Sequence, residues 1–114
     1  MPELIAAPLV KAVRALSLEA DEQFYELREL GHRCGIDELA LQLDDQIFRV
    51  DYLVSSGQIS ESQGALVKQI HALLGSISGA SNAAFWRPES LRFSPVWRQV
   101  RLLANEFMDH GFPD

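Results

Sequence analysis

The sequence predicts an all-α protein, a compact bundle of four main helices plus short helical segments. Apolar residues recur at spacings of three and four along almost the whole chain. Helix start and stop signals separate these stretches, and no convincing period-two alternation indicates a strand. At 114 residues, 47% of them hydrophobic, the chain is expected to form one domain over residues 1–114. A chain of this length buries roughly two thirds of its unfolded surface without a disulfide or a metal.

Two helices are expected before residue 35. Leu9, Val13 and Leu16 mark a short first helix, and Pro8 is compatible with its first turn. Ser17 is the expected N-cap of the second helix, because its hydroxyl can accept a hydrogen bond from the first turn. The apolar face of this second helix comprises Ala20, Phe24, Leu27 and Cys34.

The third and fourth helices should form an antiparallel hairpin, because the turn between them is short. The third is expected to start with Asp37 as its cap, to run to about Ser55 and to end at Gly57. Its core stripe comprises Leu39, Leu43, Ile47, Val50 and Val54. Ser60 and Gln63 form a capping box that opens the fourth helix. Its core stripe comprises Leu66, Ile70, Leu73 and Ile77.

The last third of the chain contains a loop around Gly79, one helical turn over residues 88–91 and a final helix. The dipeptide Ser94-Pro95 is a strong start signal for that helix, and Gly111 is expected to end it. Its core residues are Val96, Val100, Leu103 and Phe107.

The net charge of −6 is concentrated in one third of the chain. Residues 19–51 contain ten acids and three arginines, a net charge of −7, whereas residues 1–18 sum to +1 and residues 52–114 to zero. Such an asymmetry bears on partners rather than on fold, and it indicates a surface for a basic partner.

Composition excludes several classes of function. A pI near 4.9 argues against nucleic acid or an anionic membrane as the partner. Cys34 is the only cysteine, so no intrachain disulfide can form and a reducing compartment is expected. The N-terminus does not resemble a signal peptide, and no stretch approaches the roughly 20 apolar residues that span a bilayer. We therefore expect a cytoplasmic protein.

The acidic residues of the second helix form one candidate surface. Glu19, Glu22, Glu26 and Glu29 share a stripe opposite the apolar face, and only Glu29 has a basic residue four positions later. Glu22 and Glu26 are therefore candidate partner-binding residues that supply steering charge.

The third helix carries the second candidate surface. Leu41, Phe48 and Tyr52, here termed the apolar line, lie opposite the core stripe. Acids flank this line on one edge (Asp37, Asp44 and Asp51) and on the other (Glu38 and Asp45). Asp44, Asp45, Phe48 and Tyr52 are the candidate contact residues, because aromatic rings supply desolvated area and carboxylates supply charge pairing.

A purely structural interpretation competes with this one. A helix with two apolar stripes is usually a central bundle helix that touches two neighbours. The general tendency of large aromatic residues favours burial of Phe48, while Tyr52, with its polar tip, fits either place. Likewise, the acids could form a solvated face.

No pattern indicates catalysis, a metal or a cofactor. His32, Cys34, His71 and His110 lack the recurring spacing of a zinc site, and no phosphate loop or nucleophile motif is present. Convergence of three of the carboxylates with His71 in a pocket would favour an enzyme. Trp97 is expected in the core, whereas Trp86, which lies in a loop, is the better candidate for an exposed position. Four arginines should pair with the acidic half: Arg87, Arg92, Arg98 and Arg101.

The chain resembles a group of small helical bacterial proteins, the immunity proteins of polymorphic and contact-dependent toxin systems. The likeness covers roughly residues 39–105 and is one of pattern. It is carried by Leu43-Asp44-Asp45 through Leu53-Val54, by Gly57-Gln58-Ile59-Ser60, Leu73-Leu74, Ser78-Gly79 and Phe85-Trp86, and by Ser94 through Arg101. The resemblance implies a cognate toxin domain as partner and no enzyme activity, and it assigns no individual residue.

Two hypotheses of function follow. The first is an immunity protein, a monomer or weak homodimer, that binds and neutralises a basic toxin domain, such as a nuclease. The second is a non-catalytic helical module that self-associates or joins a larger complex, with the apolar line as its seam.

Overall fold

The computed structural model describes residues 6–30 and 35–111. This part of the chain contains α-helices and two 3-10 helices (η1 and η2) and no strand, which confirms the all-α prediction. The elements are α1 (Ala7–Ser17), α2 (Ala20–Leu30), α3 (Asp37–Asp44), η1 (Ile47–Arg49), α4 (Val50–Ser55), α5 (Glu61–Ser76), η2 (Ala80–Trp86), α6 (Pro88–Phe93) and α7 (Pro95–Asp109).

The prediction of four main helices undercounts them. Within the described residues, five helices have eight residues or more: α1, α2, α3, α5 and α7. The difference lies in α1, which was expected to be a minor piece. It packs along α7 and against α3, and its buried residues are Leu9, Ala12, Val13 and Leu16.

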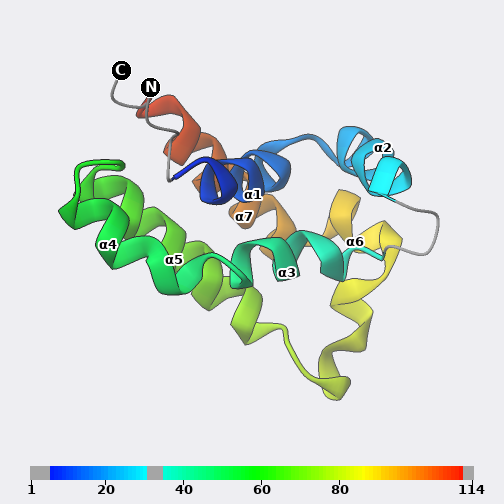
Figure 1. Ribbon diagram of the computed structural model, residues 1–114. Coiled ribbons are helices and arrows are strands. Elements are labelled where there is room, and N and C mark those ends of the chain that lie inside the picture. The colour runs from blue at the N-terminus through cyan, green and yellow to red at the C-terminus, as the bar shows by residue number, and fades with distance from the viewer. Residues whose placement is uncertain (1–5, 31–34, 112–114) are drawn as a thin grey trace.

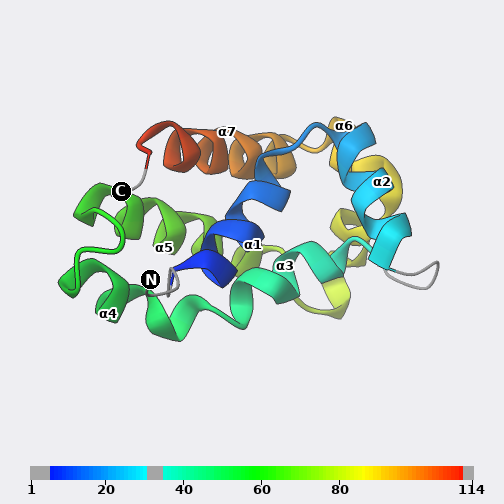
Figure 2. The same cartoon turned by 45° about the horizontal axis from the view of Figure 1, so that its top comes forward.

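Three helices, α4, α5 and α7, lie in a row, and α1 packs on this row. Helices α4, α5 and α7 run side by side, with α5 antiparallel to both, and α1 lies between α7 and α3 (Figures 1 and 2). The expected hairpin is therefore formed by α4 and α5. Helices α2 and α6 lie together at the opposite end from α4 (Figure 2). The core between these elements includes Leu16, Leu43, Ile70, Trp97 and Phe107.

The third expected helix is not continuous. Helix α3 ends at Asp44, and the chain passes through η1 before α4 begins. The amide of Gln46 donates to the carbonyl of Leu43, three residues back, and φ of Gln46 is −108°, outside the α-helical range. Leu53, which lay outside the predicted stripe, is completely buried, whereas Ile47 and Val54, which belonged to it, are only partly buried.

Two predicted caps are wrong. Helix α1 continues through Ser17, whose hydroxyl donates back to the carbonyl of Arg14 (2.6 Å). Helix α2 begins two residues later than a Ser17 cap requires, and the amide of Glu19 donates to Glu22 Oε1 (3.3 Å). Asp37 is the first residue of α3 rather than its cap, and there its charge suits the helix dipole.

The other start and stop signals are confirmed. The Ser60–Gln63 capping box is complete, and the Ser94 hydroxyl accepts from the amide of Val96. Gln63 is buried and also donates to the carbonyls of Phe107 and Gly111. Its amide therefore joins the start of α5 to the end of α7, a contact that the capping-box pattern alone does not imply.

Arg101 ties three other parts of the fold to α7. Its Nε donates to the carbonyl of Leu18 (2.7 Å), and its Nη2 donates to Gln23 Oε1 (2.9 Å) and to the carbonyl of Leu91 (3.1 Å). Burial lowers the pKa of Arg101, the nearby charge of Glu19 raises it, and that of Arg98 lowers it. Buried Gln23 in turn donates to carbonyls at the end of α1. One guanidinium thus connects α7 to the α1–α2 junction, to α2 and to α6.

Gly64 allows α4 and α5 to approach closely. A Cβ atom at this position would lie 2.7 Å from Val54 Cγ2 and 3.6 Å from Val50 Cγ1. We expect Gly64→Ala to lower the free energy of unfolding by about 1–2 kcal/mol, because overpacking outweighs the gain in helix propensity. Urea unfolding measures the change. Gly75→Ala, in the same helix but with no atom within 4 Å of its Cβ, is the matched control and should be neutral or stabilising. An equal response at both positions would contradict the close-packing argument.

Candidate functional site

The apolar line is exposed to solvent. The exposed fractions are 49% for Leu41, 79% for Phe48 and 57% for Tyr52. The expected burial of Phe48 is therefore wrong. The segment from α3 to α4 packs against α1 and α5, so its buried side chains face these helices and the apolar line is left on the outside.

The acids on one edge of the apolar line lie next to α5. Asp44 Oδ1 is 3.0 Å from His71 Nε2, and Asp51 Oδ1 is 2.7 Å from Lys68 Nζ. Both pairs are exposed, so each contributes little to stability. The Lys68–Asp51 pair instead changes the surface charge, because Lys68 offsets the negative charge of Asp51.

Asp45 lies on the other edge, next to α1. It lines a shallow hollow of about 250 Å³ together with Lys11 and Gln46. Asp44 and Asp45 are neighbours in sequence but face different helices. They border the apolar line from opposite sides, as the helical spacing predicts.

The two candidate acidic surfaces do not meet. Glu22 is exposed and Glu26 is half-buried on α2, while Phe48 and Tyr52 belong to η1 and α4 at the other end of the molecule (Figures 1 and 2). Glu22 and Glu26 can therefore act on an approaching partner through their charge, but they do not extend the contact surface of the apolar line.

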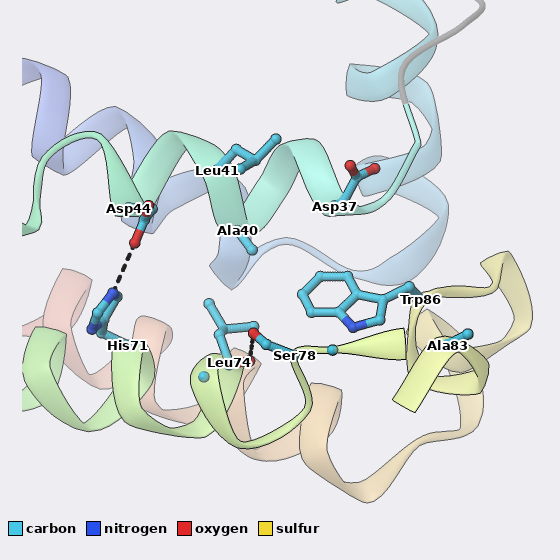
Figure 3. Close-up of a pocket in the computed structure, with 11 residues that line it drawn as sticks. Asp37, Ala40, Leu41, Asp44, His71, Leu74, Ser78, Ala83 and Trp86 are labelled. Carbon is cyan, nitrogen blue, oxygen red and sulfur yellow. Dashed lines mark hydrogen bonds and ion pairs between the residues drawn. The ribbon is translucent and has the colours of Figure 1, made fainter. Parts of the chain in front are cut away.

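A groove between α3, α5 and η2 adjoins the apolar line, and the sequence did not predict it (Figure 3). We term it the α3–α5 groove. Its volume is about 530 Å³. Its lining residues are Asp37, Ala40, Leu41, Asp44, His71, Leu74, Gly75, Ser78, Gly79, Ala83 and Trp86. The only sequence feature that pointed to this region was the glycine-containing stretch between α5 and η2. That stretch indicates a change of chain direction, but it does not show that a groove forms there.

Trp86 forms part of the groove wall rather than projecting freely. Its Nε1 donates to the carbonyl of Ile77 (2.7 Å), and its ring meets that of Trp97 edge-on, with centroids 5.5 Å apart. Trp97 is buried, as predicted, and its Nε1 donates to the carbonyl of Phe85. The two indoles therefore hold η2 against the start of α7.

The groove does not assemble a catalytic arrangement of the expected kind. Its lining includes Asp37, Asp44 and His71, two of the three carboxylates whose convergence with His71 would have favoured an enzyme. The hydroxyl of Ser78 donates to the carbonyl of Leu74, and no hydrogen bond joins it to His71. Across residues 6–30 and 35–111, no three histidine, cysteine or acidic side chains are grouped so that they could hold a metal ion. His32 and Cys34 lie outside the described residues.

The C-terminal arginines pair with the acidic half only in part. Arg92 forms an ion pair with Asp21, and its guanidinium lies 5.2 Å from the centre of the Phe24 ring. The hydrogen bonds of Arg101 are to carbonyl and amide oxygens rather than to a carboxylate.

Comparisons with known proteins identify no family. No family model matches the chain, and neither the curated proteins nor the solved structures contain a match. In the described part of the chain, no helix is both long and apolar enough to cross a membrane.

Proposed function

We propose that this chain is a non-catalytic binding protein that neutralises a basic protein partner, and more specifically an immunity protein for a cognate toxin domain. One observation carries the proposal: Phe48 and Tyr52 are solvent-exposed at the C-terminal end of the acidic stretch 19–51, with Phe48 inside it and Tyr52 directly after it. Exposed aromatic side chains bordered by carboxylates are characteristic of a protein-binding surface.

The charge distribution supports a basic partner. Asp44 and Asp45 border the aromatic side chains from opposite sides, and the stripe with Glu22 and Glu26 adds negative potential at the far end. Such a field accelerates association with a cationic surface and weakens it with a like-charged one. An inhibitor of a toxin benefits from rapid association, because damage accumulates until the complex forms.

The resemblance to small helical immunity proteins supplies the toxin as the partner class. The test uses, as the partner, the C-terminal domain of a large toxin encoded directly upstream of this chain. We expect co-expression of the chain to restore growth of cells producing that domain, and the two purified proteins to form a 1:1 complex. Absence of both protection and complex formation would exclude the immunity function.

Self-association is the second candidate, and the exposure of the apolar line favours it as well. Sedimentation at several protein concentrations separates the two functions. A stable homodimer that buries Leu41, Phe48 and Tyr52 would remove that surface from a toxin interface, whereas a monomer or weak dimer is compatible with it.

Charge reversal tests the steering role. We expect Asp44→Lys with Asp45→Lys to slow association with the toxin domain by at least about tenfold at low salt, and by less at high salt, because screening weakens the field. Stopped-flow fluorescence measures the rate. Glu106→Lys with Asp109→Lys on α7 makes the same change in net charge at exposed positions elsewhere and is the control. Equal slowing by both pairs would mean that net charge, and not this surface, controls association.

A further inference from the structure

The interior of the α3–α5 groove is apolar. Figure 3 shows Ala40 of α3, Leu74 of α5 and the Trp86 ring of η2 around the same space. Gly75 leaves the wall open beside Leu74, because no atom lies within 4 Å of a Cβ built at this glycine. The groove volume of about 530 Å³ lies within the roughly 300–1,000 Å³ of ligand-binding clefts. It is therefore large enough to take a whole side chain of a partner.

The polar side chains in the lining do not require a polar ligand. Ser78 and Trp86 each donate to a backbone carbonyl near the end of α5, and Asp44 bonds to His71. The carboxylate of Asp37 points away from the groove (Figure 3). An apolar group that enters the groove therefore leaves none of these donors without a partner, and it removes the exposed part of the apolar wall from water.

The rim of the groove is acidic. Asp37 and Asp44 are exposed at the two ends of α3, about 10 Å apart along the helix axis. Asp37 forms no ion pair within residues 6–30 and 35–111, and the described residues that line the groove include neither lysine nor arginine. The rim therefore attracts a basic group that lies beside an apolar side chain and repels an acidic one. The same field disfavours a second copy of this chain, whose net charge is −6.

We propose that the α3–α5 groove binds a large apolar side chain of the basic protein partner, in a segment where basic residues flank that side chain. The proposal rests on the proposed function, since the segment belongs to the same basic partner. It adds a second contact site beyond Phe48 and Tyr52, together with the residue pattern that this site recognises.

The groove is continuous with the apolar line and is formed before a partner arrives. Leu41 belongs to the line and also lines the groove, so a partner that covers Phe48 and Tyr52 lies next to the groove. The hydrogen bond from Trp86 Nε1 and the edge-on contact with the Trp97 ring hold the indole in place. Such preorganisation reduces the entropy lost on binding.

The test uses three short peptides, Ac-Lys-Phe-Lys-NH₂, Ac-Lys-Ala-Lys-NH₂ and Ac-Glu-Phe-Glu-NH₂. Each is titrated into the ¹⁵N-labelled full chain and followed by NMR. We expect the first peptide to give saturable shifts at the Trp86 indole and the Gly75 amide, with the distant Gly57 amide unchanged. The alanine peptide should bind at least about tenfold more weakly, because it buries little apolar surface. The glutamate peptide should bind at least about threefold more weakly, because the rim repels it.

Two pairs of variants locate the site. Gly75→Leu should abolish the shift at the Trp86 indole by filling the groove, whereas Ala72→Leu, at an exposed position of α5 outside the lining, should leave it unchanged. Asp44→Asn should weaken binding of the Lys-Phe-Lys peptide by about threefold. Asp109→Asn, which makes the same change in net charge on α7, should have no effect. Far-UV circular dichroism confirms that each variant is folded, and the comparison of peptides does not depend on the variants.

Equal binding of the phenylalanine and alanine peptides, or of the lysine and glutamate peptides, would overturn the proposal. Saturable shifts confined to the amides of Phe48 and Tyr52 would do the same. So would a dimer of the chain alone that Gly75→Leu dissociates, since the groove would then bind a second copy. None of these results bears on toxin neutralisation, which the co-expression experiment tests by itself. Conversely, peptide binding in the groove of a chain that protects against no toxin would leave the site in place and remove the immunity function.

Discussion

Simultaneous replacement of Phe48 and Tyr52 by alanine is expected to weaken binding of the toxin domain by about 100-fold or more. Truncation of a central aromatic residue in an interface commonly reduces the binding free energy by about 2 kcal/mol or more. The losses from two such truncations are only partly additive. The same change should leave the free energy of unfolding within about 1 kcal/mol of the parent, because both side chains are exposed. Isothermal titration calorimetry and urea unfolding measure the two quantities.

A matched control separates this surface from general stickiness. Phe93 and Leu102 are also large, apolar and exposed, at 75% and 58%, but they belong to α6 and α7. Their replacement by alanine should leave toxin binding unchanged. A large loss of stability in the Phe48→Ala, Tyr52→Ala chain would mean that these side chains are packing residues after all. Unchanged affinity would place the interface elsewhere.

Arg101→Leu is expected to lower the free energy of unfolding by about 2–4 kcal/mol, the largest effect on stability that we predict for a single side chain. The substitution preserves apolar contact along the stem but removes donors from the carbonyl of Leu18, from Gln23 Oε1 and from the carbonyl of Leu91. Acceptors that lose a charged donor inside a structure incur most of their desolvation cost. The midpoint and slope of a urea transition report the change.

Arg98→Leu is the natural comparison. Arg98 is exposed one turn earlier on α7, so its replacement should change stability by no more than about 0.5 kcal/mol. Similar effects of the two substitutions would show that positive charge on α7, and not the hydrogen bonds of Arg101, stabilises the fold. Neither variant alters a residue of the apolar line or of the α3–α5 groove, so toxin affinity should be unchanged in the folded fraction.

The break between α3 and α4 shows where helical periodicity fails. Residues 37–55 carry an apolar spacing that fits one straight helix, and no proline or glycine interrupts it. The interruption at Gln46 lies between α3, which packs on both α1 and α5, and α4, whose Val50 and Val54 face Gly64 of α5. The spacing of residues along one segment holds no information on such tertiary contacts, so it did not predict the break.

The composition of the candidate site and the placement of its acids around the helix could be predicted from the sequence, but the burial of its side chains could not. Helical spacing correctly placed Asp44 and Asp45 on opposite edges of the apolar line, because angles around a helix follow from residue number. The exposure of Phe48 was not predictable, since burial depends on whether another element covers that face. The role of Trp86 in the groove wall likewise depends on how η2 returns across the end of α5.

By itself, the amino-acid sequence determined the all-α class, the capping box at Ser60, the start of the last helix at Ser94-Pro95 and the acidic character of residues 19–51. These features are local, since each depends on residues within a few positions of one another. Only the tertiary structure decided which apolar stripe is buried, that Arg101 joins distant segments and that a groove lies between α3, α5 and η2. Those properties depend on the packing of helices far apart in sequence, where burial and hydrogen-bond satisfaction are balanced over the whole molecule.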